Sequence, residues 1–253
     1  MLTTILSQGA ASSDFDVFHA LNEGGLISWS TAIILTVMLF FSLFIMFTKL
    51  FEQQKVINQA KRVQGTFWSN ISNLREGAAK LEKNTAFRQI VDDGIAAQEQ
   101  HKKLTDPVEA HDWLHGSLAR SEGMINSQLG TGLAFLATVG STAPFIGLFG
   151  TVVGIFRALI KIGAEGDASI GTVAGPVGEA LIMTALGLVV AVPAVMAYNW
   201  LQRRNKFIAE QLSAFSNDVL GFLASDGAVR PEVAKKAPAP AAKPVAPAAK
   251  PAA

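Results

Sequence analysis

The chain has 253 residues, of which 50% are hydrophobic and 16% charged, and its net charge is +1. A net charge so close to zero argues against a nucleic-acid partner, because binding phosphates needs a basic patch. The absence of cysteine excludes a disulfide scaffold and thiolate metal sites. This composition fits either a soluble core or a membrane protein, so the distribution of charge along the chain must decide.

Charged residues are nearly absent from three stretches. Residues 28–47 hold none, residues 129–159 hold only Arg157, and residues 173–201 hold only Glu179. About 20 apolar residues in a helix cross the hydrocarbon core of a bilayer, which is roughly 30 Å thick. The sequence therefore predicts an all-α integral membrane protein with three transmembrane helices and long cytoplasmic helical extensions.

Basic residues set the predicted orientation. They follow the first and third stretches directly, at Lys49, Lys55, Lys61, Arg62, Arg203, Arg204 and Lys206. The positive-inside rule then places the N-terminus on the outer side of the membrane, which is the periplasm if the membrane is a bacterial inner membrane, and the C-terminus in the cytoplasm. The predicted segments are a periplasmic segment 1–27, a first transmembrane helix 28–48, a cytoplasmic helical insert 49–128, a second transmembrane helix 129–161, a periplasmic loop 162–172, a third transmembrane helix 173–201, a cytoplasmic helical extension 202–228 and a disordered Ala/Pro/Lys tail 229–253.

The insert shows helical periodicity. Apolar residues recur at steps of three and four, which predicts one helical stripe over Ala60, Val63, Phe67, Ile71, Leu74, Ala78 and Leu81. A break at 83–85 precedes a second helix over 87–97. Asp106 and Pro107 then form a helix start, from which we expect one helix of about 55 residues, because single glycines such as Gly130 weaken a helix without ending it. Apolar residues recur at the same spacing of three and four after the third span, which predicts that its helix extends into the cytoplasm. They are Ile208, Leu212, Phe215, Val219 and Phe222.

Small residues line one face of the second and third spans. They recur at steps of three or four at Ala137, Gly140, Pro144, Gly147, Thr151, Gly154 and Ala158, and again at Ala180, Thr184, Gly187, Ala191 and Ala194. Small faces let transmembrane helices approach closely. The two spans are therefore expected to pack against each other or against neighbouring helices.

Glu179 is the candidate functional residue. A charge at the bilayer centre costs about 2.5 to 3.5 kcal/mol, so such a residue usually faces a bundle interior or a wet cavity. Thr151 and Thr184 are candidates beside it. Glu179 and Thr184 are five residues apart, about 140° around an ideal helix, so they do not share one face. Two interpretations stay open for the hydroxyl groups: they order water beside Glu179, or they bond carbonyls of their own helix.

Other motifs point away from enzymes. His111 and His115 lie four residues apart beside Glu109 and Asp112, but the metalloprotease pattern is absent and no third ligand is evident. This spacing favours an exposed helix face. No phosphate loop, nucleophile elbow or acid pair occurs. We therefore expect no enzymatic activity, no cofactor and no metal site.

Two segments carry a family resemblance: LAFLATVGSTAPFIGLFGTVVGIF at 133–156 and GPVGEALIMTALGLVVAVPAVMAYN at 175–199. Together they resemble the paired signature of the MotA/TolQ/ExbB proton-channel family, more its ExbB than its TolQ members. The first span and the insert match in order and size rather than in motif. By this resemblance Glu179 corresponds to the intramembrane glutamate of the family, Thr151 to the threonine of its LFGT segment, and Thr184 to the threonine that follows the glutamate.

The resemblance implies a function as well as a fold. It implies a homo-pentamer of three-span subunits in the bacterial inner membrane, surrounded by lipid and enclosing the transmembrane helices of single-span ExbD-type partners. With a TonB-type protein, this assembly would use the proton motive force to energise outer-membrane transporters, such as those that import iron–siderophore complexes. A TolQ-type subunit of the Tol-Pal system is the alternative within the family. Two further alternatives are a non-conducting membrane scaffold and a cation channel that needs no partner.

Overall fold

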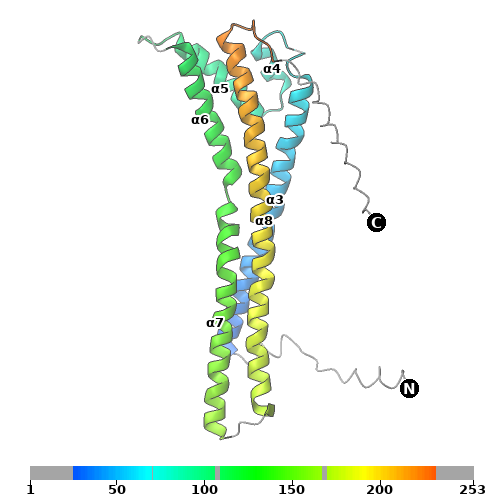
Figure 1. Ribbon diagram of the computed structural model, residues 1–253, viewed down its shortest axis with the longest axis vertical. Helices are drawn as coiled ribbons and strands as arrows, with labels where there is room; N and C mark the ends of the chain where they lie inside the picture. The colour runs from blue at the N-terminus through cyan, green and yellow to red at the C-terminus, as the bar shows by residue number, and fades with distance from the viewer. Residues whose placement is uncertain (1–24, 70, 106–108, 167–169, 232–253) are drawn as a thin grey trace, which may run out of the picture. The chain divides into compact units, whose positions relative to one another are not determined.

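A computed structural model describes residues 25–69, 71–105, 109–166 and 170–231. Within these ranges the chain forms helices and turns without a strand, which confirms the all-α prediction. The predicted N-terminal segment and the Ala/Pro/Lys tail fall largely outside the described residues, and so do Asp106 and Pro107. The helices are α3 (Gly25–Thr66), α4 (Leu74–Lys80), α5 (Ala86–His101), α6 (Ala110–Gly130), α7 (Leu133–Glu165) and α8 (Ile170–Ala224) (Figure 1).

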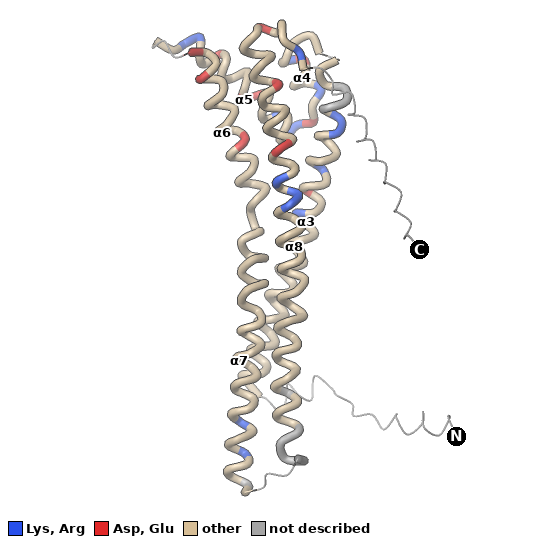
Figure 2. Tube along the Cα trace, viewed as in Figure 1, with Lys and Arg blue, Asp and Glu red and all other residues tan. Residues whose placement is uncertain are grey.

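Three helical stretches are long and apolar enough to cross a membrane. They lie within Gly25–Val63, Ala110–Ala164 and Gly175–Ala224. Figure 2 shows long uncharged lengths on α7 and α8, over which neither helix carries a described Lys, Arg, Asp or Glu. The three apolar helices expected from the sequence are therefore present.

The chain divides into two compact units. The first combines Met1–Val56 with Glu122–Gln211, and the second combines Ile57–Ser121 with Leu212–Ala253. The part of the predicted insert, 49–128, that belongs to the second unit is therefore shorter, Ile57–Ser121. The two ends of the insert group with the apolar helices of the first unit. The predicted C-terminal extension, 202–228, is divided: its residues up to Gln211 belong to the first unit, and those from Leu212 on group with the insert.

In the first unit, α3, α7 and α8 pack together over most of the apolar length, and Figure 1 shows α7 and α8 side by side. One buried cluster joins the three helices and consists of Leu35, Val139, Ala143, Val190, Ala191 and Ala194. A second cluster consists of Leu133, Leu136, Ala197 and Leu201. Many larger apolar side chains of these helices stay exposed, including Phe44 at 59% and Phe145 at 70%. Such surfaces suit contact with lipid or with other membrane helices.

The prediction of one helix from Asp106 to Ile162 is wrong. α6 ends at Gly130, and α7 begins two residues later, after Thr131 and Gly132. Gly132 has a φ of +85°, a left-handed conformation that glycine adopts without the steric cost of a Cβ atom. A pair of glycines around Thr131 therefore ends a helix that each single glycine would only weaken.

The stripe predicted over residues 60–81 is correct in burial for six of its seven residues, since Leu81 is half-buried, but it is wrong in shape. Ala60, Val63 and Phe67 are buried, as are Ile71, Leu74 and Ala78, yet α3 ends at Thr66 and a separate helix, α4, begins at Leu74. The side chain of Asn73 accepts a hydrogen bond from the backbone N–H of Glu76, which caps the start of α4. The chain thus turns back on itself while keeping these side chains in one core.

Aromatic rings form the core of the second unit. Phe215 lies 5.4 Å from Phe67 and 5.2 Å from Phe87 between ring centroids, and Phe222 lies 5.7 Å from Trp68. The predicted break at residues 83–85 is confirmed, because Thr85 caps the start of α5 by accepting from the backbone N–H of Arg88. The apolar residues predicted after the third span are all buried: Ile208 in the first unit, and Leu212, Phe215, Val219 and Phe222 in the second.

Candidate functional site

Backbone contact between α7 and α8 creates the candidate site. A Cβ atom on Gly147 would lie 2.6 Å from the Met183 carbonyl oxygen and 3.1 Å from the Gly187 Cα atom. A Cβ atom on Gly154 would lie 3.0 Å from that of Ala180. This confirms the small-residue faces expected from the sequence, because small residues let two helices approach so closely.

Thr151 and Thr184 meet within this contact. Their hydroxyl groups form a hydrogen bond to each other. The Thr151 hydroxyl also lies 3.1 Å from the Gly147 carbonyl oxygen, one turn earlier in α7, and 3.2 Å from the Ala180 carbonyl oxygen of α8. Thr151 is buried, with 9% of its surface exposed. The sequence left open whether the Thr151 hydroxyl bonds its own helix or orders water beside Glu179. In the structure it lies within hydrogen-bond distance of a carbonyl of its own helix and also of two groups on α8.

Glu179 lies on α8 immediately before Ala180. The carbonyl of Ala180 is the α8 acceptor within reach of Thr151, so the backbone next to Glu179 belongs to the threonine contact. The structure thus brings Thr151 and Thr184 together on one helix pair, and places the Glu179 backbone within one residue of that contact. The direction of the Glu179 side chain stays a prediction.

Two carboxyl groups outside the predicted spans have shifted pKa values. The hydrogen bond from Lys80 lowers the pKa of Glu76, and burial raises the pKa of Asp218. Both carboxyl groups belong to the second unit. Both therefore lie outside the predicted spans, Asp218 on the length of α8 that belongs to the second unit.

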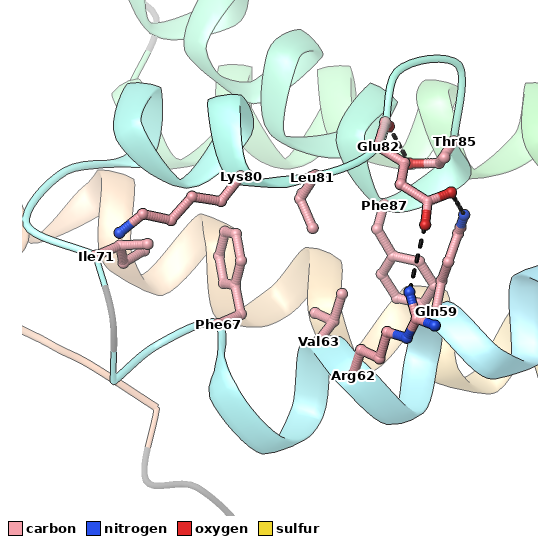
Figure 3. A pocket seen from close by; sticks show the side chains of 10 residues that line it. All are labelled: Gln59, Arg62, Val63, Phe67, Ile71, Lys80, Leu81, Glu82, Thr85 and Phe87. Carbon is pink, nitrogen blue, oxygen red and sulfur yellow. Dashed lines mark hydrogen bonds and ion pairs between the residues drawn. The ribbon is translucent and has the colours of Figure 1, made fainter.

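The second unit contains a pocket of about 310 Å³ on the aromatic core. Figure 3 shows Val63, Phe67 and Ile71 lining its apolar side, while Gln59 and Arg62 point toward Glu82. Gln59 donates to Glu82 at 3.2 Å, and Arg62 donates to the other oxygen of Glu82 at 3.4 Å. These polar groups therefore satisfy one another, and Lys80, which also lines the pocket, donates to the carboxylate of Glu76.

His111 and His115 lie on the exposed surface of α6 with stacked rings, 6.3 Å apart between centroids. This confirms the exposed helix face predicted for them. His111 lies 3.5 Å from the carboxylate of Asp112. In the described part of the chain, no group of three or more His, Cys, Asp or Glu side chains is arranged to hold a metal ion.

Comparison with known proteins agrees with this geometry. The family model for the MotA/TolQ/ExbB proton channel family matches residues 82–214. The chain belongs to this family. The match covers α7, the break before it and most of α8. Members of this family are membrane proton-channel subunits, and the three apolar helices fit a membrane protein.

Several relatives refine the comparison. A "Biopolymer transport protein ExbB" from Xanthomonas campestris pv. campestris is 37% identical over 214 residues, which are 81% of this chain and 84% of that protein. A protein of the same name from Neisseria gonorrhoeae is 47% identical over 117 residues, 46% of this chain and 53% of that protein. A "Tol-Pal system protein TolQ" from Pseudomonas aeruginosa is 31% identical over 183 residues, 69% of this chain and 79% of that protein.

A buried polar cluster was missed by the sequence analysis. Gln53 of α3 is completely buried, and its amide nitrogen donates to the Leu201 carbonyl oxygen and to the Asn205 side chain of α8. Both amides lie just beyond the uncharged stretches, where polar residues are expected in any case. The sequence held one sign of this cluster: Lys49 and Gln53 are four residues apart, which places two polar groups on one face of α3.

Proposed function

We propose that this chain is an ExbB-type subunit of the bacterial inner membrane, which uses the proton motive force together with ExbD-type and TonB-type partners. The assembly energises TonB-dependent uptake across the outer membrane, such as the import of iron–siderophore complexes. The observation that carries the proposal is the Thr151–Thr184 contact beside Glu179, found in a chain of a proton-channel family. Its relatives named ExbB support the choice within the family.

In the proposed mechanism, the Glu179 carboxyl group faces a central cavity and alternates between its neutral and charged forms. The hydroxyl groups of Thr151 and Thr184 each offer one donor and two acceptor sites, so they can orient water beside the carboxyl group. Each charge that crosses the membrane releases about 2.3 kcal/mol per 100 mV, several times the thermal energy, which is enough to move a loosely held partner helix. The role is one of transport rather than enzymatic catalysis.

A complete relay needs a second acid. The predicted spans contain no other carboxylate than Glu179. We therefore assign the second carboxyl group to an aspartate on the single transmembrane helix of the ExbD-type partner. Five copies of this chain surrounding that helix, with periplasmic N-termini, cytoplasmic C-termini and lipid outside, complete the proposed assembly.

A TolQ-type role in the Tol-Pal system is the second candidate, and the relative from Pseudomonas aeruginosa favours it. The two roles differ in the partner proteins that the channel drives. Complementation separates them: an ExbB-type chain restores siderophore uptake in a strain that lacks its own ExbB, whereas a TolQ-type chain restores outer-membrane integrity in a strain that lacks TolQ.

The direct test measures proton uptake into vesicles that contain the purified chain with or without an ExbD-type partner. We expect conduction only when both are present, because this chain has one intramembrane acid per copy. Conduction by the chain alone would instead support a self-sufficient cation channel. The absence of conduction in both preparations, with assembly intact, would support a scaffold.

The two threonines give a second prediction. Thr151→Val and Thr184→Val keep the side-chain volume and remove a donor and an acceptor, so we expect proton-driven uptake to fall much further than the stability of the oligomer. Thr151→Ser and Thr184→Ser should be milder, because the hydroxyl group stays. Uptake and detergent-resistant oligomer are measured for all four variants. Full activity of both Val variants would show that the hydroxyl groups only satisfy backbone carbonyls.

A further inference from the structure

Gln53 and Asn205 form a polar cluster at one end of the apolar bundle. The Gln53 amide nitrogen donates to the Leu201 carbonyl oxygen at 3.0 Å and to the Asn205 side-chain oxygen at 2.6 Å. None of the Gln53 surface is exposed. These two bonds tie α3 to α8 where the predicted third span ends.

The same cluster reaches the end of α6. The Asn205 amide nitrogen donates to the Leu129 carbonyl oxygen at 3.0 Å, and the Lys49 ammonium group donates to the Gln128 carbonyl oxygen at 2.9 Å. Carbonyls in the last turn of a helix have no partner within their own helix. Side chains of α3 and α8 thus cap α6 directly before the break at Gly132. This fixes where α7 begins along the length of α8.

The small-residue faces do not by themselves fix that position. In the structure Gly147 lies against Gly187, and Gly154 lies against Ala180. A slip of one helical turn, about 5.4 Å, would place Gly147 against Ala191 and Gly154 against Thr184, so small residues would again face small residues. The connection between α7 and α8 has four residues, and unwinding one terminal turn would lengthen it enough for such a slip. Packing of small residues therefore leaves more than one register available.

We propose that Gln53 and Asn205 are positioning residues that select one register of α7 against α8 and so hold Thr151 against Thr184. The Gln53 side-chain oxygen is buried and has no hydrogen-bond partner among the described residues. A buried amide with an unmet acceptor lowers stability, and such groups are best known for specifying the register of packed helices. The effect on transport rests on the proposed function, whereas the effect on register does not.

Disulfide trapping reads the register directly, because the chain has no cysteine of its own. Ala143, Ala191 and Ala194 belong to one buried cluster of α3, α7 and α8, so each Ala→Cys change adds a single heavy atom. A chain with cysteines at 143 and 191 reports the observed register. A chain with cysteines at 143 and 194 responds to a slip of about one turn, because Ala194 lies three residues beyond Ala191 on α8. Since all three alanines share one cluster in the observed structure, the change in the ratio of the two disulfides carries the result, and neither disulfide does so alone.

The test introduces Asn205→Leu or Gln53→Leu into both reporter chains in native membranes. We expect the ratio of the 143–191 to the 143–194 disulfide to fall about fivefold, which corresponds to the loss of about one net hydrogen bond, the one from Asn205 to the Leu129 carbonyl oxygen at the end of α6. Asn205→Ala removes the same hydrogen bonds as Asn205→Leu with a smaller side chain. It replaces Asn205→Leu in the test if leucine at this position prevents folding. Asn199→Leu is the matched control, because Asn199 is an exposed amide of the same helix, and it should leave the ratio unchanged.

A ratio that stays at its original value in Asn205→Ala and in Gln53→Leu would overturn the proposal. A general loss of stability would lower both disulfides together and leave their ratio unchanged, so it would also overturn it. The result does not depend on proton transport: the ratio can shift even if Glu179 proves dispensable, and it can stay fixed even if Glu179 proves essential.

Discussion

Glu179→Gln is expected to abolish uptake driven by the proton gradient while the oligomer still assembles. Glutamine keeps the shape and hydrogen-bonding capacity of the side chain but cannot release a proton at cellular pH. The predicted spans contain no other carboxylate, so nothing within the subunit can take over the proton. The loss should therefore be complete rather than partial, and Glu179→Ala should show the same loss.

Siderophore uptake in a complemented strain and proton uptake in vesicles measure this effect, and oligomer size in detergent measures assembly. Glu210→Gln is the matched control, because Glu210 is an exposed carboxylate of the same helix, α8, beyond the predicted span. The control should keep full uptake. Normal uptake by Glu179→Gln would contradict the proton-transfer role and favour a scaffold in which Glu179 only fixes assembly.

Gly147→Ala is expected to destabilise the α7–α8 pair although it adds only a methyl group. That methyl carbon would lie 2.6 Å from the Met183 carbonyl oxygen, on a backbone that cannot rotate away. Overpacking of this kind costs about 1 to 3 kcal/mol. Separation of the helices would also pull Thr151 away from Thr184, so uptake should fall together with thermal stability in detergent.

Gly163→Ala is the control for this change. Gly163 lies on the same helix, and a Cβ atom there would meet nothing within 4 Å. Alanine favours the helix over glycine by about 0.5 to 1 kcal/mol, so the control should be neutral or slightly stabilising. Equal stability of Gly147→Ala and Gly163→Ala would show that α7 and α8 do not pack as closely as the structure has them.

Hydrophobic patterning alone was enough to predict the helical class and the three apolar helices. Long stretches without charge have few alternatives to a transmembrane helix, since every backbone polar group in lipid must be satisfied within the segment. The steps of three and four also identified the buried side chains of the insert correctly, because side-chain burial follows periodicity. The same patterning identified the small-residue faces of α7 and α8, and the motif around Glu179 identified the family.

The sequence did not predict where two of the helices end, because the breaks depend on local backbone conformation and hydrophobic periodicity carries no information about it. The turn after Thr66 and the left-handed Gly132 each break a pattern that reads as one continuous helix. The break before α7 is stabilised by groups distant in sequence, because Asn205 and Lys49 cap the end of α6 from other helices. A cap contributed by a residue more than 70 positions away cannot be identified from neighbouring residues.

The sequence by itself determined which three stretches are apolar enough to cross a membrane, which of their residues are small, and which carboxyl group stands alone among them. Only the tertiary structure decided that Thr151 and Thr184 face each other and that Gln53 and Asn205 join three helices. The physical reason is that composition and periodicity assign a residue to a face, whereas a contact between helices also requires their relative register. Faces of repeated small residues permit several registers, and hydrogen bonds between distant residues select one of them.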